Sequence, residues 1–155
     1  LPGTDGKAKM SKSLGNCIYL SDDAATIKQK VMSMFTDPDH IRIEDPGKVE
    51  GNTVFTYLDA FATDEHFVKF LPDFKNLDEL KAAYRKGGLG DVKIKKFLLN
   101  VLLDELKPVY DKRKIWEQKA DEVWAILKDG CAVAEKKAAE TLKAVKKAMR
   151  IDYFG

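Results

Sequence analysis

Apolar residues recur every three or four positions along most of the chain, which is the period of an amphipathic helix. The first such stretch carries Ile27 and Val31 and follows Ser21, whose hydroxyl is placed to cap a helix. Asp37-Pro38 should end this helix, because a residue that precedes proline avoids the helical conformation. Residues 17–20 form the one apolar run with strand character, so we expect a short extended piece there.

A broken stretch separates this helix from the next ones. Thr36 to Asn52 contains two prolines and two glycines among several charges, which predicts a long ordered loop. Asn52 and Thr63 each stand where an N-cap is needed before an apolar helical pattern. A third segment, Leu77 to Lys86, should end at Gly87. The aromatic residues of these segments repeat at helical spacing, so we interpret them as core rather than as platforms for stacked bases.

The rest of the chain has the pattern of long helices. The longest one should begin at Asp91, and Pro108 should kink or interrupt it, because proline cannot donate to the carbonyl four residues earlier. Residues 120–128 and 134–149 are also helical in pattern, and Gly130 predicts a break between them. The lysines on the polar side of the last helix are interpreted as a solvated face.

These elements predict an all-α fold, with a helical bundle over residues 21–155 and a loop with a short extended connection over residues 1–20. A chain of 155 residues, 45% hydrophobic and 34% charged, suits one domain with a real core. The net charge of +2 argues against non-specific coating of nucleic acid, so any such contact needs a local basic patch. Neither a membrane-spanning run nor a signal-peptide pattern is visible, and we expect a cytoplasmic protein without membrane contact.

The residues that most often bind metals are scattered. Cys17 and Cys131 lie far apart and have no second cysteine or histidine at ligand spacing, so the sequence suggests neither a zinc site nor a disulfide. His40 and His66 are also isolated, and we interpret them as ordinary polar or core histidines. We therefore expect no metal site built from the side chains of this chain.

The most informative stretch is a short polar loop near the start of the chain. Residues 9–13 place two lysines and two serines together, and Gly3, Gly6 and Gly15 flank them. Ammonium groups, hydroxyls and loop amides are the donors that bind phosphate, and glycines let the backbone approach an anion closely. The alternative is a solvated linker rich in lysine and serine.

The loop also carries a resemblance. Lys9-Met10-Ser11-Lys12-Ser13 spells the KMSKS signature of class I aminoacyl-tRNA synthetases. The chain further resembles the bacterial tryptophanyl-tRNA synthetases over essentially its whole length. The strings that carry this resemblance are Lys9 to Asn16, Ile18-Tyr19-Leu20-Ser21-Asp22, Thr36-Asp37-Pro38, Asp45-Pro46-Gly47, Glu50-Gly51-Asn52-Thr53-Val54-Phe55 and Gly87-Gly88-Leu89-Gly90-Asp91.

The resemblance implies the chemistry of the loop. It implies that Lys12 binds the phosphates of ATP, which enters with Mg²⁺, and that Lys9 and Ser11 assist, with Met10 and Ser13 completing the nucleotide-binding signature. It also implies the overall reaction, in which tryptophan is activated by ATP and then transferred to its tRNA. A helical C-terminal domain that binds the tRNA anticodon and a homodimeric parent enzyme are further implications.

The resemblance begins at the signature loop, and the family's N-terminal nucleotide-binding fold has no counterpart in these residues. We therefore expect a C-terminal part of the enzyme, with tryptophan bound mainly by the part that is not here, and an isolated chain without catalytic activity. We also expect residues 1–16 to be poorly ordered, since they contain few apolar anchors.

A second basic cluster brackets the glycine-rich turn at 87–90 and lies where the long helix should begin. A helix N-terminus attracts anions, so we propose an RNA backbone site there. Its residues are Arg85, Lys86, Lys93, Lys95 and Lys96. The alternative is a set of ordinary solvated lysines. Two other functional classes stay open as well, a free-standing tRNA-binding helical module and a structural helix bundle without catalysis.

Overall fold

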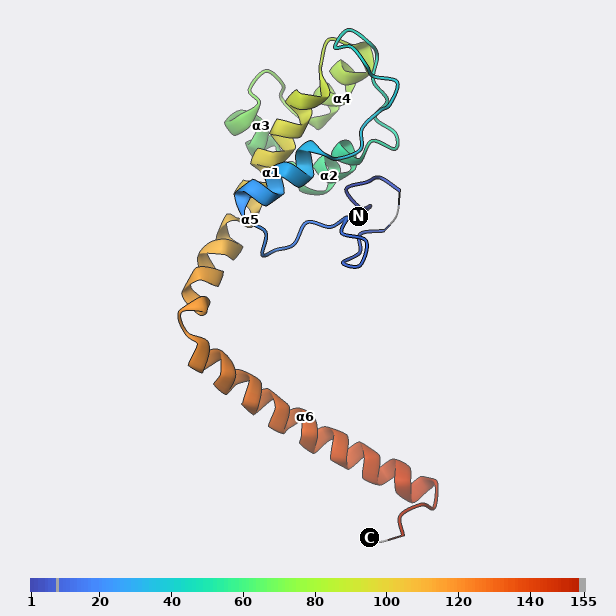
Figure 1. The fold of residues 1–155 in the computed structure, drawn as a ribbon, viewed down its shortest axis with the longest axis vertical. Helices are drawn as coiled ribbons and strands as arrows, with labels where there is room; N and C mark the ends of the chain where they lie inside the picture. Colours follow the sequence, from blue (N-terminus) through green and yellow to red (C-terminus); the bar gives the residue numbers. More distant parts are fainter. Residues whose placement is uncertain (8, 154–155) are drawn as a thin grey trace. The chain divides into compact units, whose positions relative to one another are not determined.

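The computed structural model describes residues 1–7 and 9–153 and contains six helices within them (Figure 1). Among the described residues there is no strand, apart from an isolated antiparallel bridge between Pro2 and Lys9. The all-α prediction is therefore confirmed. The helices are α1 Ala24–Met32, α2 Thr53–Phe61, α3 Asp64–Phe70, α4 Leu77–Lys86, α5 Asp91–Glu117 and α6 Ala120–Ala148.

The chain divides into two compact units, the first ending at Tyr110 and the second beginning at Asp111. The first unit contains the whole buried core, which α1 to α4 and the start of α5 enclose (Figure 1). Ile27, Leu58, Leu80 and Leu98 from four of these helices are completely buried. Burying a side chain of this size contributes roughly 1.5–3 kcal/mol, so the apolar stripes read from the sequence drive the folding of this unit.

The aromatic residues lie where a packing role requires them. Phe55 and Tyr57 of α2 and Phe67 of α3 are at most 2% exposed. Phe67 packs against Phe97 of α5 with ring centroids 4.6 Å apart, within the range of favourable aromatic pairs. The interpretation of these residues as core is confirmed.

Several helix ends match the capping signals in the sequence. The Asn52 side chain accepts a hydrogen bond from the Val54 amide (3.1 Å) at the start of α2, and Thr63 is the N-cap of α3. Helix α4 has the predicted bounds and ends at Gly87, whose φ of +88° lies in the region that favours glycine. Local capping chemistry thus determines these boundaries.

The first helix begins later than predicted. Its N-cap is Asp23, whose carboxylate accepts a hydrogen bond from the Thr26 amide at 2.7 Å, so the prediction of Ser21 was wrong. Asp22 is used differently, since its carboxylate accepts from the Tyr19 amide at 2.8 Å and pairs with Lys30. A carboxylate nearer the first turn supplies both the acceptor and the charge that a helix N-terminus favours.

One further local prediction was wrong, since Gly130 lies inside α6 and does not break it. Pro108 lies inside α5, which continues to Glu117, so the proline does not end the helix, and the kink stays a prediction. Residues 17–19 lie outside the helices as the expected connection, and within the described residues they pair with no strand. An interior proline costs about 3 kcal/mol and an interior glycine about 1 kcal/mol, which a long helix with good helix formers around the site tolerates.

The long loop between α1 and α2 is ordered, as predicted, by bonds to its own backbone and to α4. The Asp37 carboxylate accepts from the amides of Asp39 (3.0 Å) and Lys48 (2.8 Å). The Gly47 amide donates to the Tyr84 carbonyl at 3.0 Å, and a Cβ at Gly47 would lie only 2.3 Å from the Tyr84 ring. This close approach requires a glycine.

The second unit consists mainly of α6, which has no buried residue. Its apolar positions are exposed, including Trp124 and Leu142. The periodic pattern therefore predicted the helix but not the burial of its apolar stripe. Among the described residues, no helix is long and apolar enough to cross a membrane.

Candidate functional site

The signature loop has one apolar anchor and an exposed polar remainder. Met10 is partly buried and packs against the core, and it lines a small apolar cavity of about 140 Å³ together with Ile18, Tyr57 and Leu106. Lys9 extends from the bridge with Pro2 and is exposed. The loop is therefore attached to the first unit through its methionine.

Both lysines of the signature are available to a ligand. Lys12 and Ser13 are exposed, and within the described part of the chain neither Lys9 nor Lys12 has a side-chain partner. The hydroxyls of Ser11 and Ser13 lie 2.9 Å apart and share a hydrogen bond. Two uncompensated ammonium groups beside two hydroxyls fit the negative oxygens of a polyphosphate, so the residues present suit the predicted ATP site.

Asn16 organises the base of this loop, a role that the sequence reasoning did not assign. Its side chain is buried, and its Oδ1 accepts from the Ser11 amide at 2.8 Å. Its Nδ2 donates to the Asp5 carboxylate at 3.2 Å, and its carbonyl accepts from the Thr4 amide at 2.9 Å. Gly3 packs directly on this amide, since a Cβ there would lie 2.1 Å from Nδ2. An asparagine three positions after the end of the phosphate-binding signature was the available clue.

The segment that precedes the signature is held by the first unit. The Tyr57 hydroxyl donates to the Pro2 carbonyl at 2.8 Å, and burial raises the pKa of this phenol to about 12. The Phe35 amide donates to the Thr4 carbonyl at 3.0 Å, and Gly6 packs against the Phe35 ring. These contacts of residues 1–7 and 9–16 count against the expectation of a poorly ordered segment, because polar contacts replace the apolar anchors that it lacks.

The second basic cluster is largely engaged inside the molecule. Arg85 pairs with Glu50 at 2.6 Å and Lys93 pairs with Asp73 at 2.9 Å. Lys95 is half-buried and donates to the Met32 carbonyl at the end of α1 (3.1 Å). Burial lowers the pKa of the Lys95 ammonium, against the opposite influence of Asp91.

Only part of this cluster remains free. Among the described residues, Lys86 and Lys96 are exposed and have no partner for their ammonium groups. The cluster therefore presents two free cations rather than the five that its sequence suggests. Its role in RNA binding stays a prediction.

A carboxylate occupies the start of α5, where the sequence suggested an anion site. Asp91 accepts hydrogen bonds from Thr36, from the Tyr84 hydroxyl at 2.7 Å and from His40 Nδ1 at 3.0 Å. Burial raises the pKa of this carboxyl, but the three hydrogen bonds outweigh it and hold the pKa below its usual value. His40 is thus a buried structural histidine whose Nε2 has no hydrogen-bond partner among the described residues.

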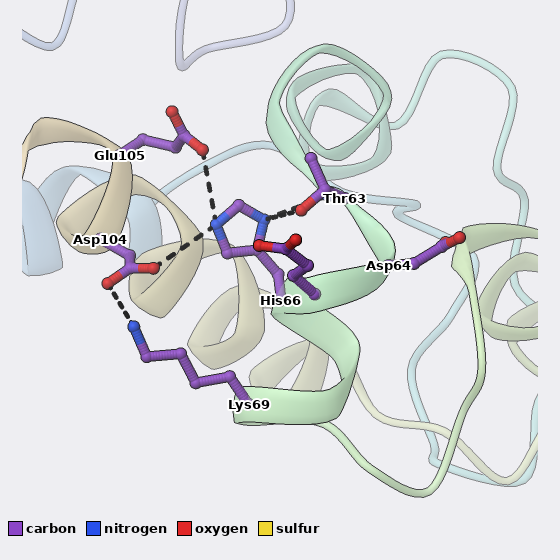
Figure 2. A pocket seen from close by; sticks show the side chains of 7 residues that line it. Thr63, Asp64, His66, Lys69, Asp104 and Glu105 are labelled. Atoms are coloured by element: carbon purple, nitrogen blue, oxygen red, sulfur yellow. Dashed lines mark hydrogen bonds and ion pairs between the residues drawn. The ribbon is translucent and has the colours of Figure 1, made fainter.

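A cavity of about 410 Å³ in the first unit surrounds His66. Figure 2 shows the imidazole between Thr63 on one side and Asp104 and Glu105 of α5 on the other. The Thr63 amide donates to His66 Nδ1 at 3.1 Å, and Nε2 lies 3.5 Å from Glu105 and 3.7 Å from Asp104. Lys69 pairs with Asp104 at 2.6 Å.

The imidazole in this cavity has a structural task. By accepting from the N-cap amide it completes the capping box of α3, and its other nitrogen faces α5. Within residues 1–7 and 9–153, no group of three or more histidine, cysteine, aspartate or glutamate side chains is arranged to hold a metal ion.

The family match and the sequence relatives of this chain agree on one family. Residues 1–107 match the model of the family described as tRNA synthetases class I (W and Y). The chain is 56% identical to the tryptophan–tRNA ligase of Clostridium longisporum and 55% identical to that of Lactococcus lactis, in each case over 99% of this chain. It covers 42% and 43% of those two proteins, so it spans about two fifths of the length of the curated relatives it matches.

A solved structure agrees with the sequence relatives. The tryptophanyl-tRNA synthetase of Campylobacter jejuni, solved with ADP and tryptophan, matches with a TM-score of 0.74 at 28% identity. The match covers 96% of this chain and 42% of that chain. The family match, the relatives and the intact signature loop with its unpaired lysines lead to the same conclusion: the chain belongs to the class I tRNA synthetases of the W and Y group.

Proposed function

We propose that this chain is part of a tryptophan–tRNA ligase and supplies its phosphate-binding signature loop and a tRNA-binding helical domain. The observation that carries the proposal is the pair of lysines, Lys9 and Lys12, which have no partner in the described chain and extend from a loop whose base is fixed. The similarity to tryptophan–tRNA ligases over 99% of the chain supports the choice of amino acid.

The proposed first reaction forms tryptophanyl-adenylate. The carboxylate of tryptophan attacks the α-phosphorus of ATP, and pyrophosphate leaves with its negative charge growing in the transition state. Lys12 binds the departing phosphates, with Lys9 and Ser11 assisting. Cations that meet this charge as it develops lower the barrier, because they bind the transition state more tightly than bound ATP. ATP enters with Mg²⁺ on its phosphates, which adds positive charge at the same place.

The proposed second reaction transfers the tryptophanyl group from the adenylate to the terminal ribose of its tRNA, with AMP as the leaving group. The helical part of the chain binds the tRNA and contacts its anticodon. Of the predicted basic cluster, Lys86 and Lys96 have ammonium groups free for the RNA backbone. The whole enzyme acts as a homodimer in the cytoplasm, with tryptophan held mainly outside the residues described.

The proposal is tested by exchange of labelled pyrophosphate into ATP, with the full-length protein that carries this sequence. We expect exchange that depends on tryptophan and is not supported by tyrosine. The comparison of the two amino acids matters because the family contains synthetases for both. No exchange with either, or exchange driven by tyrosine, would contradict the proposal.

A further inference from the structure

We propose that Asn16 is a positioning residue for the signature loop. Its buried side-chain amide fixes the backbone of Ser11, and thereby the two lysines around it, against the segment 3–5. This inference rests on the proposed function, since it assigns a role in placing Lys9 and Lys12 on the phosphates of ATP.

The first support is the way in which both ends of the Asn16 amide are used. The residue is 5% exposed, so neither end of its side chain relies on water. Oδ1 accepts from the Ser11 amide at 2.8 Å and Nδ2 donates to the Asp5 carboxylate at 3.2 Å. A buried amide with one donor bond and one acceptor bond has a single orientation, which makes it a precise spacer between two backbone segments.

The second support is the shape of the site around that amide. A Cβ at Gly3 would lie 2.1 Å from Asn16 Nδ2 and 2.7 Å from Asp5 Oδ1. The backbone of Gly3 therefore packs directly against the hydrogen-bonded side chains of Asn16 and Asp5. Only a residue without a side chain fits at this distance, so glycine is required beside this pair.

The third support is that this unit is tied to the core. The Thr4 amide donates to the Asn16 carbonyl at 2.9 Å, and the Thr4 carbonyl accepts from the Phe35 amide just beyond α1. The Tyr57 hydroxyl of α2 donates to the Pro2 carbonyl at 2.8 Å. Through these bonds the loop takes its position from two core helices.

The consequence concerns the lysines. Ser11 stands between Lys9 and Lys12, and its amide is turned inward to Asn16 while both lysine side chains are exposed. Because the middle of the loop is fixed, Lys9 and Lys12 have fewer conformations to lose when their ammonium groups bind ATP. A misplacement of about 1 Å at a catalytic group lowers a rate on the order of 100-fold. Loss of the hydrogen bond between the Ser11 amide and Asn16 should therefore lower the rate of adenylate formation.

The test uses the full-length enzyme and single-turnover formation of the adenylate, with active sites titrated so that only folded protein is counted. For Asn16→Ala we expect the rate constant to fall by about 10- to 100-fold, with a higher KM for ATP and an unchanged KM for tryptophan. Asn76→Ala is the matched control. Asn76 caps α4 by accepting from the Glu79 amide at 3.0 Å, so its loss lowers stability without touching the loop.

An exchange of partners makes the test specific. Asn16→Asp keeps an acceptor for the Ser11 amide but loses the donor to Asp5 and sets two carboxylates together, so it should also slow adenylate formation. The double variant Asp5→Asn/Asn16→Asp reverses donor and acceptor within the same pair and should recover most of the rate. A general structural defect does not predict this recovery, and the pair decides the matter even if Asn16→Ala does not fold.

The outcomes separate this inference from the proposed function. If Lys12→Ala slows adenylate formation and Asn16→Ala and Asn16→Asp do not, the positioning role is wrong and the proposed function stands. If the double variant is as slow as Asn16→Asp alone, the specific pairing with Asp5 is wrong. If Lys12→Ala has no effect on adenylate formation, the proposed function itself fails.

Discussion

Two lysine-rich regions of the first unit have similar composition but different environments. In the signature loop, the ammonium groups of Lys9 and Lys12 have no partner within the described chain. In the cluster around the start of α5, Arg85, Lys93 and Lys95 bond to other parts of the molecule. The cations of the loop remain available to a ligand, whereas most of the cations of the cluster bond to neighbouring loops and to the end of α1.

Positive charge in a sequence therefore does not by itself make a binding site. An ion pair at the surface contributes little to stability, but it neutralises a cation that an RNA phosphate would otherwise meet. The partners Glu50 and Asp73 lie 35 and 20 residues away from their cations in the chain. The availability of a cation is therefore a property of the fold.

The largest effect on activity should come from removing two lysines of the signature loop, and the same change in the cluster serves as the comparison. In the full-length enzyme, Lys9→Ala/Lys12→Ala should lower pyrophosphate exchange by at least about two to three powers of ten, the usual loss when a donor to a developing anion is removed. Lys93→Ala/Lys96→Ala, the matched pair in the cluster, should leave exchange within about twofold, since neither residue belongs to the loop. Equal losses in both variants would remove the functional distinction between the two regions.

The next effect concerns tRNA binding by the full-length enzyme and its dependence on salt. Lys86→Ala/Lys96→Ala removes two free cations and should flatten the slope of log K against log salt by about two. Arg85→Ala/Lys93→Ala removes two paired cations and should flatten it by clearly less, because Glu50 and Asp73 already compensate them. Titration of labelled tRNA at several salt concentrations measures both. A larger change in the second variant would mean that RNA displaces the internal pairs.

A smaller effect of opposite sign comes from releasing a paired cation. The hydrogen bond from Arg85 is the main cause that lowers the pKa of Glu50, so the pair is intact at neutral pH. Glu50→Gln should free Arg85 and steepen the salt slope for tRNA by at most about one. Glu79→Gln, on the surface of α4, is the control and should leave the slope unchanged. An unchanged slope in Glu50→Gln would show that the freed Arg85 does not reach the RNA.

The smallest expected effect is a change in the stability of the fold at low pH. The pKa of Asp91 is lower in the folded protein than in the unfolded chain, so its carboxylate stabilises the fold above the unfolded pKa. This contribution is lost as the pH falls through the folded pKa, below about pH 4. Asp91→Asn should therefore weaken the pH dependence of the unfolding free energy in that range, as measured by urea denaturation. If the unfolding free energy of Asp91→Asn depends on pH as it does in the unaltered protein, other carboxylates cause the loss of stability in acid.

Much of the fold follows from local chemistry in the sequence. Asn52, Thr63 and Gly87 mark helix ends in the structure as predicted, because a cap interacts with residues two to four positions away. Gly130 was misread for the opposite reason. Its local cost is real, but a long helix absorbs it, and no local rule weighs the rest of the helix against one residue.

The candidate site was predictable only in part. The signature supplied Lys9 to Ser13 directly, since the motif is contiguous. Asn16 lies five positions from Ser11, yet its role depends on Asp5 and Gly3 folding back onto it, which no periodicity indicates. The hydrogen-bonded, partly buried carboxylate of Asp91 was also missed, because Thr36, His40 and Tyr84 approach it only in the folded chain.

Pre-steady-state formation of tryptophanyl-adenylate by the full-length Lys12→Ala variant provides the most direct test of the role proposed for Lys12. If Lys12 acts on the leaving pyrophosphate, the rate constant should fall by about two to three powers of ten while the affinity for tryptophan changes little. The unaltered enzyme and Lys96→Ala, a free lysine outside the loop, serve as references. An unchanged rate constant in Lys12→Ala, or a loss confined to tryptophan binding, would contradict the account.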